Sequence, residues 1–229
     1  MGIRLEQVIP WGRSFDEYRR IFDLSDEDLK ERILGCADGP ASFNAEATER
    51  GASVVSCDPI YELDAGQIER RVVECHDDLI EQVRQRRDLF VWDEFGTPEG
   101  IGRHRLAVMR RFLTDFEAGK GQGRYVTGAL PELPFEDGAF DLALVSHFLF
   151  LYSDRLDLEF HQASVRELLR VAAEVRIYPL QTLAAVRSAH VQALEEAADR
   201  EGWDVAIRPV PYEYQRGARE MMRVRRKQT

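Results

Sequence analysis

Small residues and an acid between positions 33 and 59 form the stretch of the chain best suited to hold a ligand. The apolar pair Ile33 and Leu34 leads into a turn of small residues at 35–41. Small side chains let a ligand approach the backbone closely. We expect a helix over 42–50, whose start would present N–H groups, and a short strand ending at Asp58, which could accept both hydroxyls of a ribose. The pattern predicts a nucleoside cofactor site.

His147 is the second candidate for chemistry. It follows the apolar run from Leu142, which ends at Ser146. Such a run is typical of a central parallel strand buried on both faces, and open α/β sheets bind their ligands at the carboxyl ends of the strands. The ordinary pKa of an imidazole suits a general base near neutral pH. An equally good interpretation is a histidine that is hydrogen-bonded within a strand-to-helix loop.

The elements that must position these residues alternate along the chain, which predicts an α/β fold. The expected strands are 32–35, 54–58, 124–127, 142–146, 174–178, 203–210 and 221–225, and the expected helices are 14–22, 25–32, 42–50, 156–170 and 182–200. The last two strands follow each other without a helix, which implies an antiparallel hairpin at the sheet edge. The first two helices, within 1–31, would cover one end of the sheet or the ligand.

The segment 62–120 is longer than one crossover connection requires, so we expect a helical insertion between the second and third strands. Apolar residues repeat at helical spacing in two stretches, and Trp92 lies in a break between them. One long helix would serve as the crossover. The Trp92 segment and the second helix would form either a cap over the substrate or additional scaffold.

Bulk composition restricts the class of protein. The 229 residues suit one domain, 1–229, and 44% hydrophobic and 31% charged residues are usual for a globular chain. A formal charge of −10 opposes general affinity for nucleic acid or anionic membranes. The N-terminal residues resemble no targeting signal and no apolar run could span a bilayer, so we expect a cytoplasmic protein. The three cysteines are interpreted as reduced thiols; the sequence leaves the oligomeric state open.

Other polar residues receive weaker interpretations. His161 is expected to be structural. His76, His104 and His190 lie on expected helices without metal-ligand spacing, so no metal site is expected. Four tyrosines either line an acceptor pocket or pack in the core: Tyr152, Tyr178, Tyr212 and Tyr214. Arginines between 64 and 120 are interleaved with acids, which favours a solvated surface.

Two segments carry a resemblance to a known family. Residues 37–43 read Ala-Asp-Gly-Pro-Ala-Ser-Phe, and residues 133–141 begin Leu-Pro-Phe and end Phe-Asp. From about Ile33 to Arg225 the chain resembles the class I S-adenosylmethionine-dependent methyltransferases, which have Gly-Cys-Gly-Pro-Gly-Ser-Phe in the first segment and a similar run before strand four in the second.

The resemblance implies a Rossmann-like, doubly wound, seven-stranded and mostly parallel sheet with a C-terminal antiparallel hairpin. It also implies S-adenosyl-L-methionine as cofactor and an unidentified, small-molecule methyl acceptor. His147 would be the catalytic base. The implied cofactor-binding residues are Gly35, Cys36, Ala37, Asp38, Gly39, Asp58, Pro59, Ala129, Leu130 and Ser146.

The chain also departs from the family pattern. Gly35 and Ala129 stand where acids are usual, and Ala37 and Ala41 replace glycines, which fits the turn if φ is negative there. Asp38 adds an acid, expected near the ammonium group of the cofactor. The missing acids leave open a catalytically silent binding or scaffold protein. A nicotinamide-dependent dehydrogenase is less favoured, because Gly-x-Gly-x-x-Gly is absent.

Overall fold

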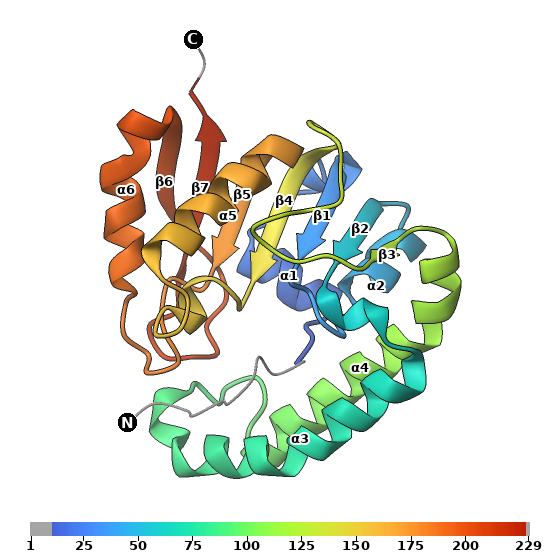
Figure 1. Ribbon diagram of the computed structural model, residues 1–229. Coiled ribbons are helices and arrows are strands. Elements are labelled where there is room, and N and C mark those ends of the chain that lie inside the picture. Colours follow the sequence, from blue (N-terminus) through green and yellow to red (C-terminus); the bar gives the residue numbers. More distant parts are fainter. Residues whose placement is uncertain (1–10, 228–229) are drawn as a thin grey trace.

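The computed structural model describes residues 11–227, so the expectations for the first ten residues lie outside it. One seven-stranded sheet crosses the molecule in the order β3-β2-β1-β4-β5-β7-β6 (Figure 1). Strands β1 to β5 are parallel, and β7 is antiparallel to both β5 and β6. The predicted α/β sheet with its C-terminal hairpin is confirmed.

The strands follow the predicted apolar runs. Their bounds are β1 Arg32–Cys36, β2 Ser53–Cys57, β3 Tyr125–Val126, β4 Phe140–Ser146, β5 Ala172–Tyr178, β6 Trp203–Pro209 and β7 Glu220–Arg226. Successive side chains of a strand point to opposite faces, so Leu142 and Leu144 enter one core while Ala143 and Val145 enter the other. The central strands are therefore buried on both sides, as a continuous apolar run requires.

Helices cover both faces of this sheet. Helices α5 (Leu158–Val171) and α6 (Ala189–Glu201) pack on one face, and α1 (Phe15–Ile21) and α2 (Phe43–Glu49) pack on the other (Figure 1). Ser14 begins α1 with a capping box that includes Glu17. The ring of Tyr18 on α1 stacks on Phe43 of α2, with 4.2 Å between centroids. The N-terminal cover is thereby fixed to the helix that follows the small-residue turn.

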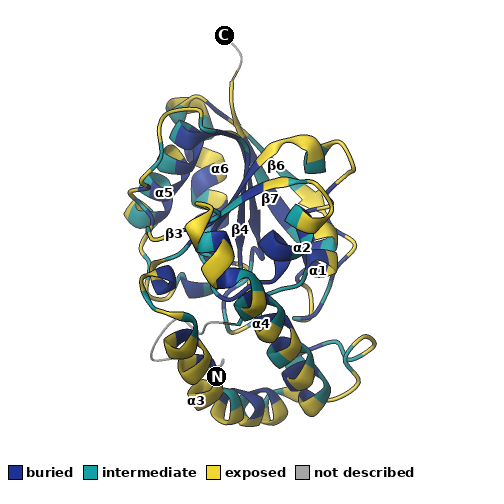
Figure 2. Cartoon of the chain, turned by 90° about the vertical axis from the view of Figure 1, so that its right-hand side faces the viewer, coloured by how far each residue is buried: buried dark blue, intermediate teal, exposed yellow. Residues whose placement is uncertain are grey.

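The insertion contains two long antiparallel helices, α3 (Ala65–Gln85) and α4 (Pro98–Gly121), which extend beyond the carboxyl edge of the sheet (Figure 1). Both begin with a capped turn, at Asp64 and Thr97. Much of α3 is exposed (Figure 2), but its buried stripe, which includes Ile68 and Leu79, faces the rest of the protein. No helix within residues 11–227 is both long and apolar enough to cross a membrane.

One helix prediction is wrong, and the helix predicted over 182–200 is confirmed only for its second part. In place of a helix over 25–32 there is a 3₁₀ turn, η1 (Asp28–Lys30), because β1 begins at once and the Asp28 carboxylate pairs with Arg176 of β5 at 2.7 Å. Residues 182–188 form a loop ahead of α6. The Ser188 N–H closes this loop by donating a hydrogen bond to the Leu180 carbonyl. Three further 3₁₀ turns are η2 (Pro59–Glu62), η3 (Arg87–Leu89) and η4 (Phe150–Tyr152).

Candidate functional site

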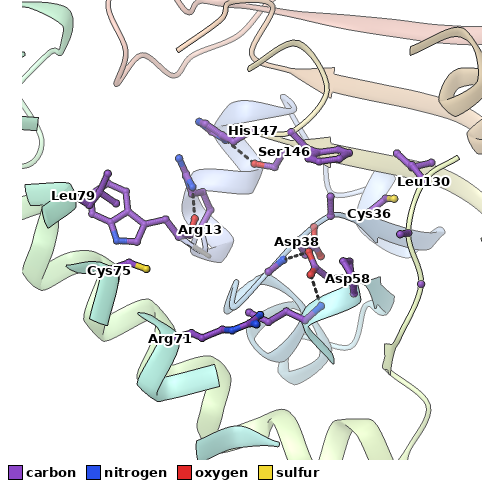
Figure 3. A pocket seen from close by; sticks show the side chains of 18 of the residues that line it. Arg13, Cys36, Asp38, Asp58, Arg71, Cys75, Leu79, Leu130, Ser146 and His147 are labelled. Atoms are coloured by element: carbon purple, nitrogen blue, oxygen red, sulfur yellow. Dashed lines mark hydrogen bonds between the residues drawn. The ribbon is translucent and has the colours of Figure 1, made fainter. Parts of the chain in front are cut away.

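A cavity of about 900 Å³ lies at the carboxyl ends of β1, β2 and β4 (Figure 3). The segment before α1 and the inner side of α3 complete its walls. Every predicted site residue except Gly35 lines this cavity: Cys36, Ala37, Asp38, Gly39, Asp58, Pro59, Ala129, Leu130, Ser146 and His147. The volume is near the upper end of the usual range for small-molecule pockets, roughly 300–1,000 Å³.

The turn after β1 is held by hydrogen bonds within the protein. The Ala37 N–H donates to the Cys57 carbonyl at 2.8 Å, and the Gly39 N–H donates to Asp58 Oδ2 at 2.9 Å. An alanine fits such a turn without strain if its φ is negative, but both Ala37 (+57°) and Gly39 (+55°) are left-handed. A left-handed alanine is unusual, because its Cβ crowds the backbone. The turn therefore presents a rigid, strained surface, in which these two N–H groups are already used.

Asp58 follows β2 and faces the cavity. Besides the bond from Gly39, its Oδ1 accepts the Ile60 N–H at 2.9 Å, which caps η2. Burial raises the pKa of this carboxyl, and the two backbone N–H groups partly oppose that rise. Each oxygen keeps a second lone pair for a ligand hydroxyl. Ile60 and Leu130 also line the cavity, so apolar side chains are available to a flat ring near the acid.

Asp38 is nearly buried beneath the turn. Its Oδ1 accepts the Tyr18 hydroxyl at 2.5 Å and its Oδ2 accepts the Ser56 hydroxyl at 2.7 Å. Burial raises the pKa of Asp38 to about 6 despite these two donors. Gly35 lies behind the carboxylate, and a Cβ at that position would be 1.9 Å from Asp38 Oδ2. Gly35 is thus needed to make room for the Asp38 side chain.

His147 directly follows β4 at the sheet edge, and its Nδ1 lies 2.8 Å from the Ser146 hydroxyl. Its φ of +54° is left-handed, and its N–H donates to the Tyr178 carbonyl at 2.6 Å. Non-glycine residues held in this conformation concentrate at functional sites. Burial, followed by the positive charges of Arg13 and Arg105, holds the pKa of His147 well below its usual range. The imidazole is therefore neutral at pH 7.

Three cavity residues before β1 were missed by the sequence interpretation: Trp11, Arg13 and Tyr18. The Arg13 guanidinium donates to the Trp11 carbonyl and makes no ion pair within residues 11–227. Its Nε is buried without a hydrogen-bond partner in that part of the chain. The helices expected within 1–31 were predicted to cover one end of the sheet or the ligand, but no motif singled out Arg13.

The outer wall of the cavity belongs to α3 and not to the segment expected to form the cap. Its lining residues are Arg71, Glu74, Cys75, Asp78, Leu79 and Gln82. Arg71 points from α3 into the cavity (Figure 3). Neither Trp92 nor any residue of α4 belongs to the described lining, and α4 instead packs against α2. Periodicity predicted two helices but not which would face the ligand.

The four candidate tyrosines are core residues and do not belong to the described lining of the cavity. The Tyr178 hydroxyl donates to the Ala218 carbonyl, and the Tyr212 hydroxyl donates to Glu17. The packing interpretation is therefore the right one. His161 is also buried, with its Nδ1 at 2.7 Å from the Asp157 carbonyl. In residues 11–227, no three histidine, cysteine or acidic side chains are grouped as a metal site would require.

A buried ion pair joins the N-terminal cover to the insertion. Arg105 of α4 donates through both terminal nitrogens to Glu17 of α1, each at 2.6 Å. Burial opposes ionisation of Glu17, but Arg105 and His104 hold the pKa of this carboxyl well below its usual range. The bidentate geometry offsets the cost of removing both charges from water. This pair fixes α1 relative to α4, which in turn packs along α3, the helix of the outer wall.

Comparison with known proteins yields one relative at appreciable identity, and the chain matches no model of a known protein family. The uncharacterized protein MJ0045 of Methanocaldococcus jannaschii is 31% identical over 228 residues, which cover 98% of this chain and 99% of the relative.

Solved structures are more distant. The mitomycin 7-O-methyltransferase is 14% identical, with a TM-score of 0.49 over 93% of this chain and 53% of that one. A TehB-like S-adenosylmethionine-dependent methyltransferase of Corynebacterium glutamicum is 13% identical, with a TM-score of 0.45 over 87% of this chain and 81% of that one. The strand order and the terminal hairpin of the chain itself carry the fold assignment. The chain belongs to the same family as the M. jannaschii protein, and its fold is the Rossmann-like fold of the class I S-adenosylmethionine-dependent methyltransferases.

Proposed function

We propose that this protein transfers a methyl group from S-adenosylmethionine to a small-molecule acceptor bound between the sheet edge and α3. The observation that carries the proposal is the convergence of the Ala37–Gly39 turn, Asp58 and His147 on one cavity at the carboxyl edge of the sheet. Ligands of open α/β sheets bind at this edge.

The residues present fit the donor. Asp58 can accept ribose hydroxyls, Ile60 and Leu130 flank the space beside it, and Arg13 offers a positive charge without an ion-pair partner among the described residues. When bound, the cofactor supplies a methyl group on a sulfonium, which becomes a neutral thioether after transfer. The protein has to exclude water, hold the acceptor and, for a protonated acceptor, take up a proton.

His147 is the proposed base. It lies on the cavity wall, and its depressed pKa keeps the imidazole neutral and able to accept a proton at pH 7. The same depression makes it a weak base, so it suits an acceptor whose own proton becomes acidic as the new bond forms. The proton would then pass from the imidazolium to solvent.

The catalytically silent alternative rested on the missing acids at Gly35 and Ala129. The carboxylate of Asp38 fills the space in front of Gly35, so an acid is present at that place in the fold although not at that place in the sequence. Ala129 lines the cavity without a polar side chain. An acid beside the turn supports the enzyme, although both of its oxygens already accept hydrogen bonds from Tyr18 and Ser56.

Calorimetry with S-adenosylmethionine, S-adenosylhomocysteine and NAD tests the proposal. We expect both sulfur compounds to bind and NAD not to bind. If neither sulfur compound binds at millimolar concentration, the proposal is contradicted. Preferential binding of NAD would support the dehydrogenase.

A further inference from the structure

The segment before α1 is held tightly against the turn that follows β1. Gly12 packs so closely on Pro40 that a Cβ at position 12 would be 2.1 Å from the Pro40 carbonyl oxygen. The Gly12 carbonyl accepts a hydrogen bond from Arg105 Nη1 at 3.1 Å, and the Arg13 carbonyl accepts the Ser42 N–H at 3.1 Å. The backbone of residues 12 and 13 is thereby fixed, and with it the place of this segment at the cavity wall.

Two N–H donors on this segment have no acceptor. Arg13 Nε and the indole Nε1 of Trp11 are buried, and neither has a hydrogen-bond partner within residues 11–227. Both residues line the cavity. Arginine and tryptophan side chains donate hydrogen bonds but do not accept them, and a buried donor without a partner is costly. A ligand group that brings acceptor atoms to this part of the cavity would remove that cost.

The charge of Arg13 is not balanced within the described part of the chain either. Its guanidinium donates to the Trp11 carbonyl and makes no ion pair with residues 11–227. The buried carboxylate of Glu17 is used by Arg105, and that of Asp38 accepts two hydroxyl groups. Burial, followed by the positive charge of Arg105, lowers the pKa of Arg13, as expected for a cation that lacks a counter-ion.

We propose that Trp11 and Arg13 form an anion subsite, and that the methyl acceptor is a small molecule whose carboxylate or phosphate group binds there. A guanidinium and an indole N–H together suit the oxygens of such a group. Arg13 lies between Asp38 of the sheet edge and Leu79 of α3 (Figure 3), on the side where the acceptor is proposed to bind. The subsite stands on the geometry alone, whereas its assignment to the acceptor rests on the proposed function.

S-adenosylmethionine also carries a carboxylate and is the competing source of the anion. The positive charge of Arg13 suits both molecules. In the donor, however, the carboxylate is joined to the carbon that bears the ammonium group, and this cation needs an acceptor beside it. The carboxylates of Glu17 and Asp38 already accept hydrogen bonds from the protein, so the subsite favours a group with a net negative charge.

The test is the titration of inorganic phosphate and of acetate, at constant ionic strength, into the free protein and into its complex with S-adenosylhomocysteine. The readout is the indole N–H signal of Trp11 in the NMR spectrum, which Trp11→Phe identifies among the three tryptophans. We expect binding in both states. Arg13→Gln should raise the Kd of the anion by about 10- to 100-fold, because a charge-assisted pair is lost. Arg13→Lys keeps the charge without the planar fork and should give an intermediate Kd.

Arg71→Gln is the matched control, because Arg71 also points into the cavity and makes no ion pair within residues 11–227 (Figure 3). It should change the Kd of the anion by less than about 3-fold. Binding of neither anion, or an equal Kd in the wild type and in both Arg13 variants, would overturn the subsite.

A second comparison separates the two sources of the anion. The Kd values of S-adenosylhomocysteine and of 5′-methylthioadenosine, which lacks the amino-acid group, should each change by less than about 3-fold in Arg13→Gln. If S-adenosylhomocysteine blocks the anions, and Arg13→Gln weakens it but not 5′-methylthioadenosine, the donor occupies the subsite and the assignment to the acceptor is overturned. Binding of the anions through Arg13 by a protein that binds neither sulfur compound would support the subsite and contradict the proposed function.

Discussion

The two long walls of the cavity differ in how firmly their side chains are held. On the sheet-edge wall, Asp38 and Asp58 are each fixed by two hydrogen bonds. On the α3 wall, the side chains of Arg71, Glu74 and Asp78 are exposed and make no hydrogen bond or ion pair with other residues of 11–227. A pre-organised wall favours one ligand and a loosely held wall accommodates several. This contrast fits a site in which the cofactor, always the same molecule, binds at the sheet edge and the acceptor binds next to α3.

The largest expected effect comes from breaking the buried ion pair between α1 and α4, the helix that packs along the α3 wall. Glu17→Gln leaves the Arg105 guanidinium buried without its counter-charge, which should lower the free energy of unfolding by about 3–5 kcal/mol. Urea unfolding measures it. The exposed pair Arg20 and Glu94 is the control, and Glu94→Gln should cost at most about 1 kcal/mol. Equal losses in the two variants would contradict a structural role for the buried pair.

Asp58→Asn tests the sheet-edge wall. The amide cannot match the charge-assisted bonds of the carboxylate, so affinity for S-adenosylhomocysteine should fall by about 1.5–3 kcal/mol, roughly 10- to 150-fold in Kd. Calorimetry on the wild type and the variant measures this. Asp204→Asn, on the far edge strand β6, is a matched control and should leave Kd unchanged. An unchanged Kd in Asp58→Asn would remove the ribose role.

The same wall should show a pH dependence through Asp38, which faces Tyr18, Ser56 and Asp58. Its pKa is 3.8 ordinarily and about 6 in the fold, so between pH 4 and 6 the folded state binds more protons than the unfolded state. The contribution of Asp38 to stability is therefore greatest at low pH and falls, by up to about 3 kcal/mol, as pH rises through this window. The difference in unfolding free energy between wild type and Asp38→Asn should shift accordingly between pH 4.5 and 7. A difference that is independent of pH would contradict the raised pKa.

The smallest effect is expected on the α3 wall. Glu74→Gln and Asp78→Asn remove exposed charges, so each should change the Kd of S-adenosylhomocysteine by less than about 3-fold. The calorimetry used for Asp58→Asn applies without change. A loss as large as that of Asp58→Asn would show that α3 holds the cofactor, and the division between the walls would be wrong.

Sequence reasoning predicted the residues of the sheet-edge wall better than those of the α3 wall. Local patterns predicted the turn, Asp58 and the apolar run to Ser146. Small-residue turns and strand ends of this kind lie at the carboxyl edge of an α/β sheet, where ligands bind. Arg13 and Tyr18 were missed because only tertiary packing brings the start of the chain across β1 and β4. The choice of α3 over α4 as the wall depends on how two similar helices pack, which periodicity does not encode.

The surroundings of Asp38 were also beyond the sequence. Asp38 was singled out, but its hydroxyl donor Tyr18 lies on α1 and no motif marks it. Alanine at position 37 was expected to fit the turn if its φ is negative, but Ala37 keeps the left-handed conformation usual for glycine and is strained there.

A crystal structure of the complex with S-adenosylhomocysteine tests the central claim most directly. We predict the ribose hydroxyls on the Asp58 carboxylate and the sulfur facing the His147 wall, with α3 open beside it for the acceptor. A ligand bound outside the cavity, or bound with its ribose away from Asp58, would contradict the account.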